Sequence, residues 1–170
     1  MTHSIRQVAA YDEAVVRGLC TLLIDAVHGG ASVGFLAPLT DERACNYWTQ
    51  VLGSLGPNLA LWVAESDGAI VGSVQLSPCG KENGRHRADV QKLFVLSACR
   101  GNGIATALMR ALEAHAVACD RTLLVLDTIA GSTAEAVYQH LGWQKVGEIP
   151  EYAAMPDGEL RPTAYYFKRI

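Results

Sequence analysis

A glycine-rich turn near the middle of the chain has the composition of a phosphate-binding loop. Arg100, Gly101 and Gly103 follow the apolar segment 93–96 and precede a segment with helical periodicity, 104–118. Amides at a helix N-terminus lack intrahelical acceptors and carry a partial positive charge, so they bind phosphate oxygens well. The pattern therefore predicts a phosphate-binding turn. A strand-to-helix turn that simply needs glycine gives the same spacing and is the alternative.

The turn matches neither of two common nucleotide-binding motifs. The pattern G-x-x-x-x-G-K-[ST] of P-loop proteins does not occur in the chain. The dinucleotide pattern G-x-G-x-x-G fails because Thr106 occupies the place of the third glycine. We therefore expect a phosphate-bearing ligand of another kind.

A second motif is typical of a different chemistry. The segment 30–34, Gly-Ala-Ser-Val-Gly, matches the G-x-S-x-G pattern of serine hydrolases, and Asp127 and His140 follow in the order that those enzymes use. That pattern requires a strand before the serine and a helix after it. Here a helical segment precedes Ser32, and Pro38 follows it. We keep the hydrolase as an alternative and expect a loop over the substrate site in which Ser32 offers its hydroxyl.

The elements that must position these residues show two periodicities. Asp67-Gly68 predicts a two-residue hairpin turn, and the strand-helix-strand unit from 87 to 128 predicts a parallel pair with a right-handed crossover. The fold class is therefore α/β, a mixed sheet with helices on both faces. The expected helices are 12–28, 41–52, 103–118 and 132–142, the last opened by a capping box of Ser132 and Glu135, and the expected strands are 58–65, 69–77, 87–96, 123–128, 144–149 and 163–168.

Composition and charge argue against several classes of protein. The length of 170 residues favours one domain over 1–170. The net charge of −3 argues against a nucleic-acid binder. The chain has no apolar run of about 18 residues and no signal-peptide pattern at its start, so we expect no membrane partner. Five cysteines without a C-x-x-C spacing and scattered histidines predict a cytoplasmic protein with neither disulfides nor a metal.

Two signatures resemble those of the GCN5-related N-acetyltransferase (GNAT) family. The segment 100–105, Arg-Gly-Asn-Gly-Ile-Ala, is similar to the R/Q-x-x-G-x-G/A signature of that family. Downstream, Ala134, Tyr138 and the pair Gly142-Trp143 resemble its second signature, although Gly131 stands where the family usually has asparagine. The strand before the first signature and the helix after it are in the places that the family requires.

The resemblance covers about 58–143 and implies the acyl-CoA N-acyltransferase fold, with a mixed, mostly antiparallel sheet of about seven strands, a central parallel pair and helices on both faces. It implies acetyl-CoA as co-substrate and no metal. In the family the strand before the turn splays from its parallel neighbour and pantetheine fills the gap, so a backbone N–H of 93–95 would hold the oxyanion. The implied cofactor-binding residues are Leu93, Phe94, Val95, Arg100, Gly101, Asn102, Gly103, Ile104, Ala105 and Thr106.

The resemblance also implies catalytic roles for three side chains. Tyr138 takes the place of the family's general acid, which protonates the leaving thiolate. Asp89 lies eleven residues before Arg100, where histone-type members carry a glutamate base, and Asp127 ends the next strand beside the splayed gap. Either carboxylate can act as the base, directly or through water, and the two remain open. A CoA-binding module without activity is a further alternative, but a phenylalanine at position 138 would favour it more than the tyrosine that is present.

Segments outside both signatures resemble the tabtoxin-resistance branch of the same family. They are 28–35, 90–93 and 156–168. This resemblance implies direct acetyl transfer in a ternary complex to the amine of a small amino-acid-like molecule, such as a tabtoxin-type β-lactam toxin, in a resistance reaction. Ser32, Phe35 and Trp48 are the expected substrate-binding residues, and the expected assembly is a monomer or homodimer.

Overall fold

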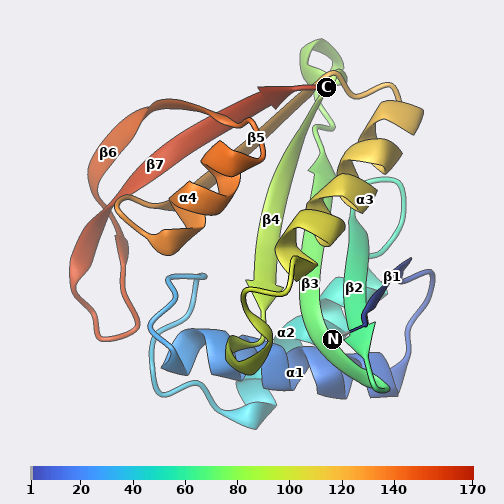
Figure 1. Ribbon diagram of the computed structural model, residues 1–170, viewed down its shortest axis with the longest axis vertical. Coiled ribbons are helices and arrows are strands. Elements are labelled where there is room, and N and C mark those ends of the chain that lie inside the picture. Colours follow the sequence, from blue (N-terminus) through green and yellow to red (C-terminus); the bar gives the residue numbers. More distant parts are fainter. Residues whose placement is uncertain (1) are drawn as a thin grey trace.

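Seven strands form one sheet in the spatial order β1-β2-β3-β4-β5-β7-β6 (Figure 1). The computed structural model describes residues 2–170. Within this range only β4 and β5 are parallel neighbours, and the other neighbouring pairs are antiparallel. This sheet confirms the predicted fold class. The strands are β1 (Ser4–Gln7), β2 (Ala60–Ser66), β3 (Ala69–Pro78), β4 (Arg87–Val95), β5 (Leu123–Ile129), β6 (Gln144–Ala154) and β7 (Leu160–Arg169), and the helices are α1 (Glu13–His28), α2 (Asp41–Gly53), α3 (Ile104–Ala118) and α4 (Thr133–His140).

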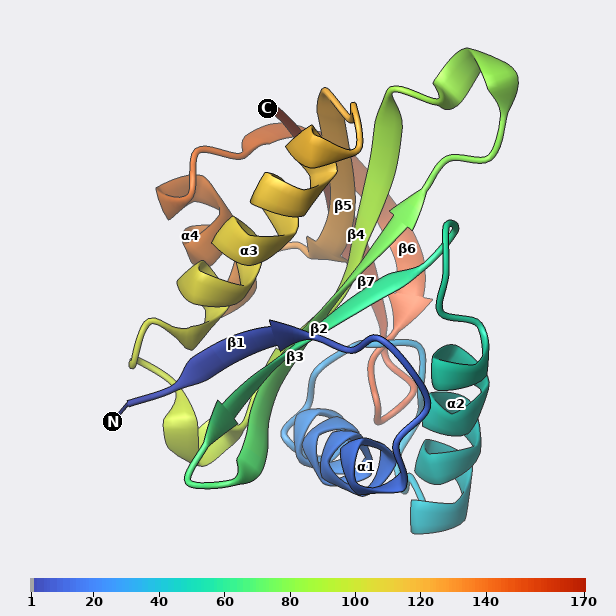
Figure 2. The same cartoon turned by 90° about the vertical axis from the view of Figure 1, so that its right-hand side faces the viewer.

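Helices cover both faces of the sheet, as predicted (Figure 2). α1 and α2 pack on one face, and α3 and α4 pack on the other, each pair over its own cluster of buried apolar residues. α1 begins at Asp12, whose carboxylate accepts a hydrogen bond from the Ala14 N–H at 2.8 Å and so caps the helix. Over residues 2–170, no helix combines the length and the apolar character needed to cross a membrane.

The predicted hairpin between β2 and β3 is confirmed. Asp67 and Gly68 form its turn, with φ of 50° and 77°. A two-residue turn of type I′ needs positive φ at both positions, and its twist matches that of the flanking strands. The turn therefore fixes the register of β3 before the chain reaches β4.

Both edges of the sheet differ from the sequence prediction. β1 is not foreseen by the pattern because it is only four residues long and mostly exposed. β6 is expected at 144–149 but runs on to Ala154, with a register shift between Ile149 and Ala153 and a φ of 51° at Glu151. Most of β6 is exposed, so no buried face imposes an alternation that a sequence pattern could reveal.

The predicted capping box at the start of α4 is wrong. Ser132 is the N-cap residue, but its side chain makes no capping hydrogen bond. Glu135 is buried and accepts hydrogen bonds from the Gly131 N–H, from Lys145 Nζ and from the Tyr166 hydroxyl. The contacts with Lys145 and Tyr166 anchor α4 to β6 and β7.

Candidate active site

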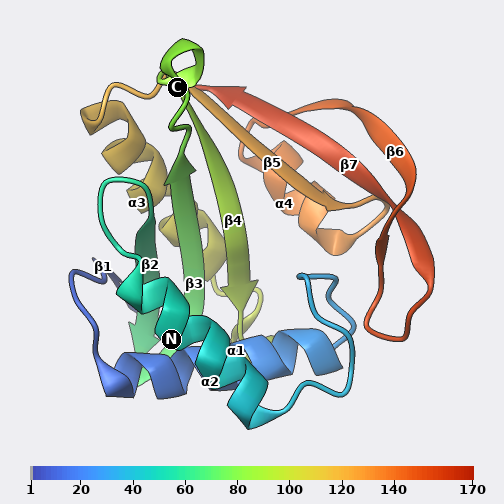
Figure 3. The ribbon, with the colours of Figure 1, turned by 180° about the vertical axis from the view of Figure 1, so that it is seen from behind.

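The parallel strands β4 and β5 diverge in the middle of the sheet (Figures 1 and 3). Their paired register ends where Asp89 faces Val125. β4 continues to Val95 against β3, and β5 continues to Ile129 against β7. The facing edges of β4 and β5 therefore carry backbone groups without a sheet partner beyond this point. This is the splay that the family resemblance implied.

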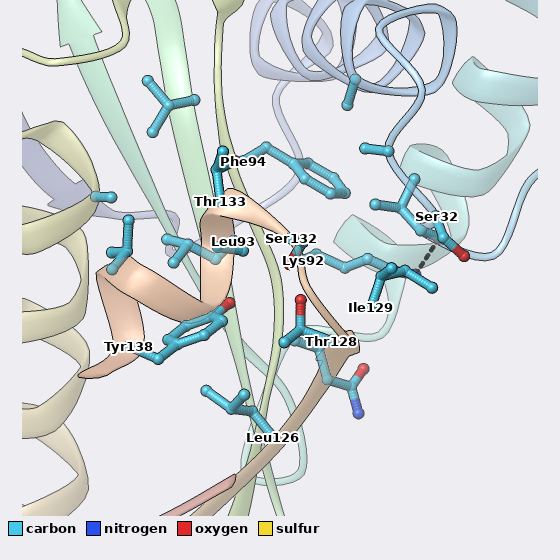
Figure 4. Close-up of a pocket in the computed structure, with 18 of the residues that line it drawn as sticks. Ser32, Lys92, Leu93, Phe94, Leu126, Thr128, Ile129, Ser132, Thr133 and Tyr138 are labelled. Atoms are coloured by element: carbon cyan, nitrogen blue, oxygen red, sulfur yellow. Dashed lines mark hydrogen bonds between the residues drawn. The ribbon is translucent and has the colours of Figure 1, made fainter. Parts of the chain in front are cut away.

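A cavity of about 920 Å³ occupies the gap. Its size is in the range of cofactor and small-molecule sites. At one end it is lined by residues of the turn 99–106 and the start of α4. At the other end it is lined by the loop 29–34, by 89–92 and by residues of β6, β7 and the turn between them. Figure 4 shows the middle of the cavity, with Tyr138 on one side and Lys92 and Ser32 on the other.

The turn before α3 presents unpaired backbone amides to the first end. Gly103 caps the helix at a φ of 75°, and no side chain caps it. The Ala107 N–H is the first to bond within the helix, to the Gly103 carbonyl at 3.0 Å, so the amides of 104–106 have no intrahelical acceptor. A Cβ at Gly103 would meet open space. Asp25 of α1 braces the approach to the turn by accepting hydrogen bonds from the Ser97 N–H and hydroxyl, at 2.9 and 2.6 Å.

A β-bulge in β4 places Lys92 at the second end. Ser73 pairs with Phe94 and Gln75 pairs with Gln91, so one residue of β3 faces two of β4. Lys92 lies in the bulge with a φ of 53°, an uncommon conformation for a residue with a long side chain. Its carbonyl accepts a hydrogen bond from the Ser73 hydroxyl at 3.2 Å. The sequence pattern of β4 gave no signal for this bulge, and Lys92 was not among the expected site residues.

Two carboxylates and one ammonium face this second end. Asp89, Asp127 and Lys92 all line the cavity. Burial raises the pKa of Asp89, and the Arg87 guanidinium partly offsets that rise. Loss of water also raises the pKa of Asp127, against the attraction of Lys92. Burial lowers the pKa of Lys92, against the attraction of Asp127. Asp89 and Lys92 are half-buried and so incompletely solvated, while Asp127 is more exposed; partly desolvated charges of this kind are common where protons are transferred or ligand charges are bound.

Tyr138 projects from α4 into the cavity, with its hydroxyl directed toward the strand that carries Leu93 (Figure 4). Its ring is buried against Trp143 and Tyr166, with centroids 6.0 and 6.1 Å away. Burial, and then the negative charge of Asp127, raises the pKa of Tyr138. The phenol therefore stays protonated at neutral pH and can donate its proton to a group in the cavity.

Most of the residues expected at the site line the cavity. They include Tyr138, Asp89, Asp127, Ser32 and the expected cofactor-binding residues other than Asn102. The Asn102 side chain instead braces the turn and donates to the carbonyl of Cys99 at 3.0 Å and to that of Arg100 at 3.3 Å.

Two expected substrate contacts lie away from the cavity wall. Trp48 is fully buried in the core under α2, where its ring packs edge-on against Phe94 with centroids 6.5 Å apart. This position corrects the expectation that Trp48 touches a substrate. Phe35 is half-buried and packs edge-on against Tyr47, which in turn contacts Trp48, and it is not part of the cavity lining. Through Tyr47, the two aromatic residues therefore pack the loop after α1 against α2.

The serine hydrolase alternative lacks its geometry. The Ser32 hydroxyl donates to the carbonyl of Ala154 at 3.1 Å, and the serine lies in the loop after α1 rather than after a strand. His140 is exposed in the last turn of α4, and within residues 2–170 no histidine lines the cavity. The loop after α1 does lie against the second end of the cavity, since the Ala37 N–H also donates a hydrogen bond to the Pro156 carbonyl at 2.9 Å.

The residues 57–145, just over half of the chain, match the family model of the acetyltransferase (GNAT) domain. The chain belongs to the GNAT family. This GNAT chain is 36% identical over 111 residues to an uncharacterized N-acetyltransferase of Azospirillum brasilense, covering 64% of the chain and 65% of the relative. It is 29% identical over 147 residues to an uncharacterized N-acetyltransferase of Methanocaldococcus jannaschii, covering 85% of the chain and 86% of the relative.

A solved structure shares the fold of this GNAT chain over its whole length. The phosphinothricin acetyltransferase of Sinorhizobium meliloti, solved in complex with acetyl-CoA, superposes with a TM-score of 0.80 at 18% identity and covers 100% of this chain and 89% of that chain. Other curated relatives match over less of their own length, since the chain spans 65% of the Azospirillum protein and 40% of N-acetyltransferase 8 of Rattus norvegicus.

The comparisons confirm the GNAT family that the two signatures indicated. The extent of one domain over 1–170, the roles of the site residues and the narrower resemblance to tabtoxin-resistance enzymes stay predictions. In the part of the chain that the structure describes, no three His, Cys, Asp or Glu side chains gather where they could hold a metal ion.

Proposed function

We propose that this protein is an acetyl-CoA-dependent N-acetyltransferase that acts on the amine of a small amino-acid-like molecule. The observation that carries the proposal is the cavity between the diverging strands β4 and β5. Unpaired amides at the start of α3 line one end of this cavity, and Asp89 and Asp127 line the other end. Acetyl-CoA is elongated, with an anionic pyrophosphate far from its thioester, so a site of this length and polarity suits it. Membership of the GNAT family supports the class of reaction.

The residues present fit the co-substrate. The amides of 104–106 can bind pyrophosphate oxygens because no side chain or helical carbonyl occupies them, and the open space at Gly103 lets a phosphate approach the backbone. Arg100 lines the same end and adds positive charge. The unpaired edge of 93–95 can hydrogen-bond to the amide groups of pantetheine in the manner of a strand.

Acetyl transfer would take place between the two ends of the cavity, where Tyr138 lies. Asp89 or Asp127 removes a proton from the acceptor ammonium, directly or through water. The free amine attacks the thioester carbonyl, so that a C–N bond forms and the C–S bond breaks. A backbone N–H of 93–95 stabilises the oxyanion. Tyr138, which is protonated at neutral pH, gives its proton to the departing thiolate, and the phenolate regains a proton, directly or through water, from the nitrogen of the newly formed amide.

The acceptor end favours a small polar amine over a protein tail. It is lined by the loop 29–34, by Ala153 of β6 and by Met155 of the β6–β7 turn, and its charged side chains are Asp89, Lys92 and Asp127. A tabtoxin-type β-lactam toxin has the required size and chemistry, and toxin resistance is the role that we propose. The resemblance of 28–35, 90–93 and 156–168 to tabtoxin-resistance enzymes supports it. We place the enzyme in the cytoplasm as a monomer or homodimer, and the five free cysteines suit a reducing compartment.

A thiol-release assay with acetyl-CoA tests this function. The acceptor panel contains amino acids, β-lactam amino acids, polyamines and aminoglycosides, and mass spectrometry identifies the acetylated amine. We expect release of CoA with amino acids or β-lactam amino acids. Acetyl-CoA binding without acetylation of any amine would contradict the proposal and favour a CoA-binding module.

A further inference from the structure

Lys92 is one of two cations that line the described cavity, and it lies at the end away from the turn of Arg100. The bulge in β4 holds its backbone in the left-handed region, where a long side chain is uncommon. Conformations of this kind are retained where the surrounding structure enforces them and are frequent at functional sites. The position of Lys92 is therefore imposed by the sheet rather than chosen by the local sequence.

The Lys92 ammonium is only partly satisfied by the protein. Nζ donates to the carbonyl of Val33 at 2.6 Å and lies 5.7 Å from the centroid of the Tyr47 ring. An ammonium has three N–H donors, so the carbonyl leaves others for a ligand. Within residues 2–170, no carboxylate forms a salt bridge with Lys92. A charge withdrawn from water in this way gains from an anionic partner.

Asp127 and Asp89 complete an arrangement of separated opposite charges. The charges of Asp127 and Lys92 shift each other's pKa, yet the two side chains form no salt bridge in the described part of the chain. Asp89 adds a second negative charge to the same end. A cavity lined by one ammonium and two carboxylates is complementary to a molecule that carries both an anionic and a cationic group.

We propose that Lys92 is a specificity-determining residue that binds the carboxylate of the acceptor while Asp89 and Asp127 face its amine. The inference rests on the proposed acetyltransferase function and narrows its substrates to amines that carry a carboxylate. Loop 29–34 takes part, because the Val33 carbonyl fixes the ammonium and a Cβ at Gly34 would lie 3.5 Å from Nζ. An acceptor without a carboxylate leaves the Lys92 charge without its anion.

The test uses matched pairs of acceptors. Each pair is an L-amino acid and its carboxamide, drawn from the twenty standard residues, and acetylation is followed by thiol release at saturating acetyl-CoA. The amide has the more acidic ammonium group and so offers more free amine at neutral pH. A preference for the acid therefore runs against the reactivity of the amine and reports recognition of the carboxylate.

Three variants separate recognition from structure. Lys92→Met keeps the length and apolar stem of the side chain but removes the charge, and Lys92→Arg keeps the charge. Lys81→Met makes the same change at an exposed lysine away from the cavity. Circular dichroism and thermal melting check that each variant is folded, and if Lys92→Met does not fold, the preference of the wild type for acids over amides remains the test.

We expect the wild type and Lys81→Met to prefer acids over amides by kcat/KM. Lys92→Met should raise KM for the acids by about 10- to 100-fold, with little change for amides, because it removes a hydrogen bond between charged groups. Lys92→Arg should retain much of the preference. Equal losses for acids and amides in Lys92→Met, or efficient acetylation of amides by the wild type, would overturn the role of Lys92 and leave the acetyltransferase function standing. Acetylation of no acid in the panel would also overturn it, and an acetyl-CoA titration would then show separately whether the co-substrate site holds.

Discussion

Asp89 faces Val125 in the last pair that the parallel strands β4 and β5 form. On one side of this pair the strands are hydrogen-bonded in register, and on the other side they diverge around the cavity. The end of the β4–β5 pairing therefore leaves the edge of 93–95 without a partner strand and places the Asp89 carboxylate at the start of the gap. The position of the acceptor end relative to the co-substrate end follows from where the pairing stops.

Tyr138→Phe should lower kcat by about 10²-fold, within the usual contribution of one general acid, with acetyl-CoA affinity nearly unchanged. The variant keeps the buried ring and its contacts with Trp143 and Tyr166, so the fold should persist. Stopped-flow or steady-state thiol release measures the rate, and calorimetry measures the affinity.

Tyr11→Phe is the matched control for that variant, because Tyr11 is 55% exposed and lies before α1. It should behave as the wild type. A Tyr138→Phe enzyme with full kcat would remove the tyrosine from the proton transfer and leave water as the acid.

The base is identified by the pH dependence of the rate. Asp89→Asn or Asp127→Asn should depress kcat/KM most below about pH 8, where the acceptor amine is charged, and high pH should partly restore it. The raised pKa of each carboxyl moves the acidic limb of the wild-type profile above that of an ordinary aspartate. The variant rescued at high pH marks the base. Equal losses at every pH in both variants would show that the carboxylates only bind the substrate.

Asp89→Asn should also change stability with a defined sign. Burial raises the pKa of Asp89, so the folded state holds its proton more tightly than the unfolded state, and ionisation disfavours folding. The destabilisation sets in as the pH rises above about 4, the ordinary pKa of the carboxyl in the unfolded chain. It is complete once the pH exceeds the raised pKa of the folded state. Asp89→Asn should therefore melt at a higher temperature than the wild type at neutral pH and lose this advantage near pH 4 and below.

Glu82→Gln, at an exposed carboxylate in the β3–β4 connection, is the control for this measurement. Its melting temperature should follow the wild type across the same pH range. A lower melting temperature of Asp89→Asn at neutral pH would mean that the native contacts of the carboxylate outweigh its desolvation.

Ser32→Ala should raise KM for the amine by about two- to tenfold, because it removes one hydrogen bond that ties the loop to β6. Wild type and variant should both be inactive toward a simple ester, and a fluorophosphonate should label neither. Stoichiometric labelling of Ser32 would instead support serine nucleophile chemistry and contradict the role given to this loop.

The features with a strong local cause were predictable from the sequence. The hairpin at Asp67-Gly68 follows from two positions that accept positive φ, and α1 follows from its cap at Asp12 and its apolar stripe. The turn before α3 was visible because glycine marks both the backbone conformation and the space for a ligand. Tyr138 was found through the resemblance to the GNAT family, since an aromatic residue on an amphipathic helix is by itself an ordinary core residue.

The features set by tertiary structure were not predictable. The bulge at Lys92 leaves the composition of β4 unchanged, so an alternating pattern cannot reveal it. Trp48 lies near the loop in sequence, but α2 turns it into the core. Glu135 fits a capping pattern, but its carboxylate instead accepts hydrogen bonds from Lys145 and Tyr166. In each case the deciding contact comes from a segment remote in the chain or from the pairing of two strands.

The central claim is that the turn before α3 binds the pyrophosphate of acetyl-CoA, and titration of two variants at one position tests it directly. Gly103→Ala and Gly103→Glu share the strain of a side chain at a φ of 75°, and only the glutamate adds bulk and negative charge where the pyrophosphate should lie. Isothermal calorimetry should give micromolar acetyl-CoA affinity for the wild type and an affinity within a few-fold of it for Gly103→Ala. The folded Gly103→Glu protein should lose at least about 100-fold, because like charges in contact are strongly unfavourable. Unchanged acetyl-CoA affinity in Gly103→Glu would contradict the assignment of this end of the cavity.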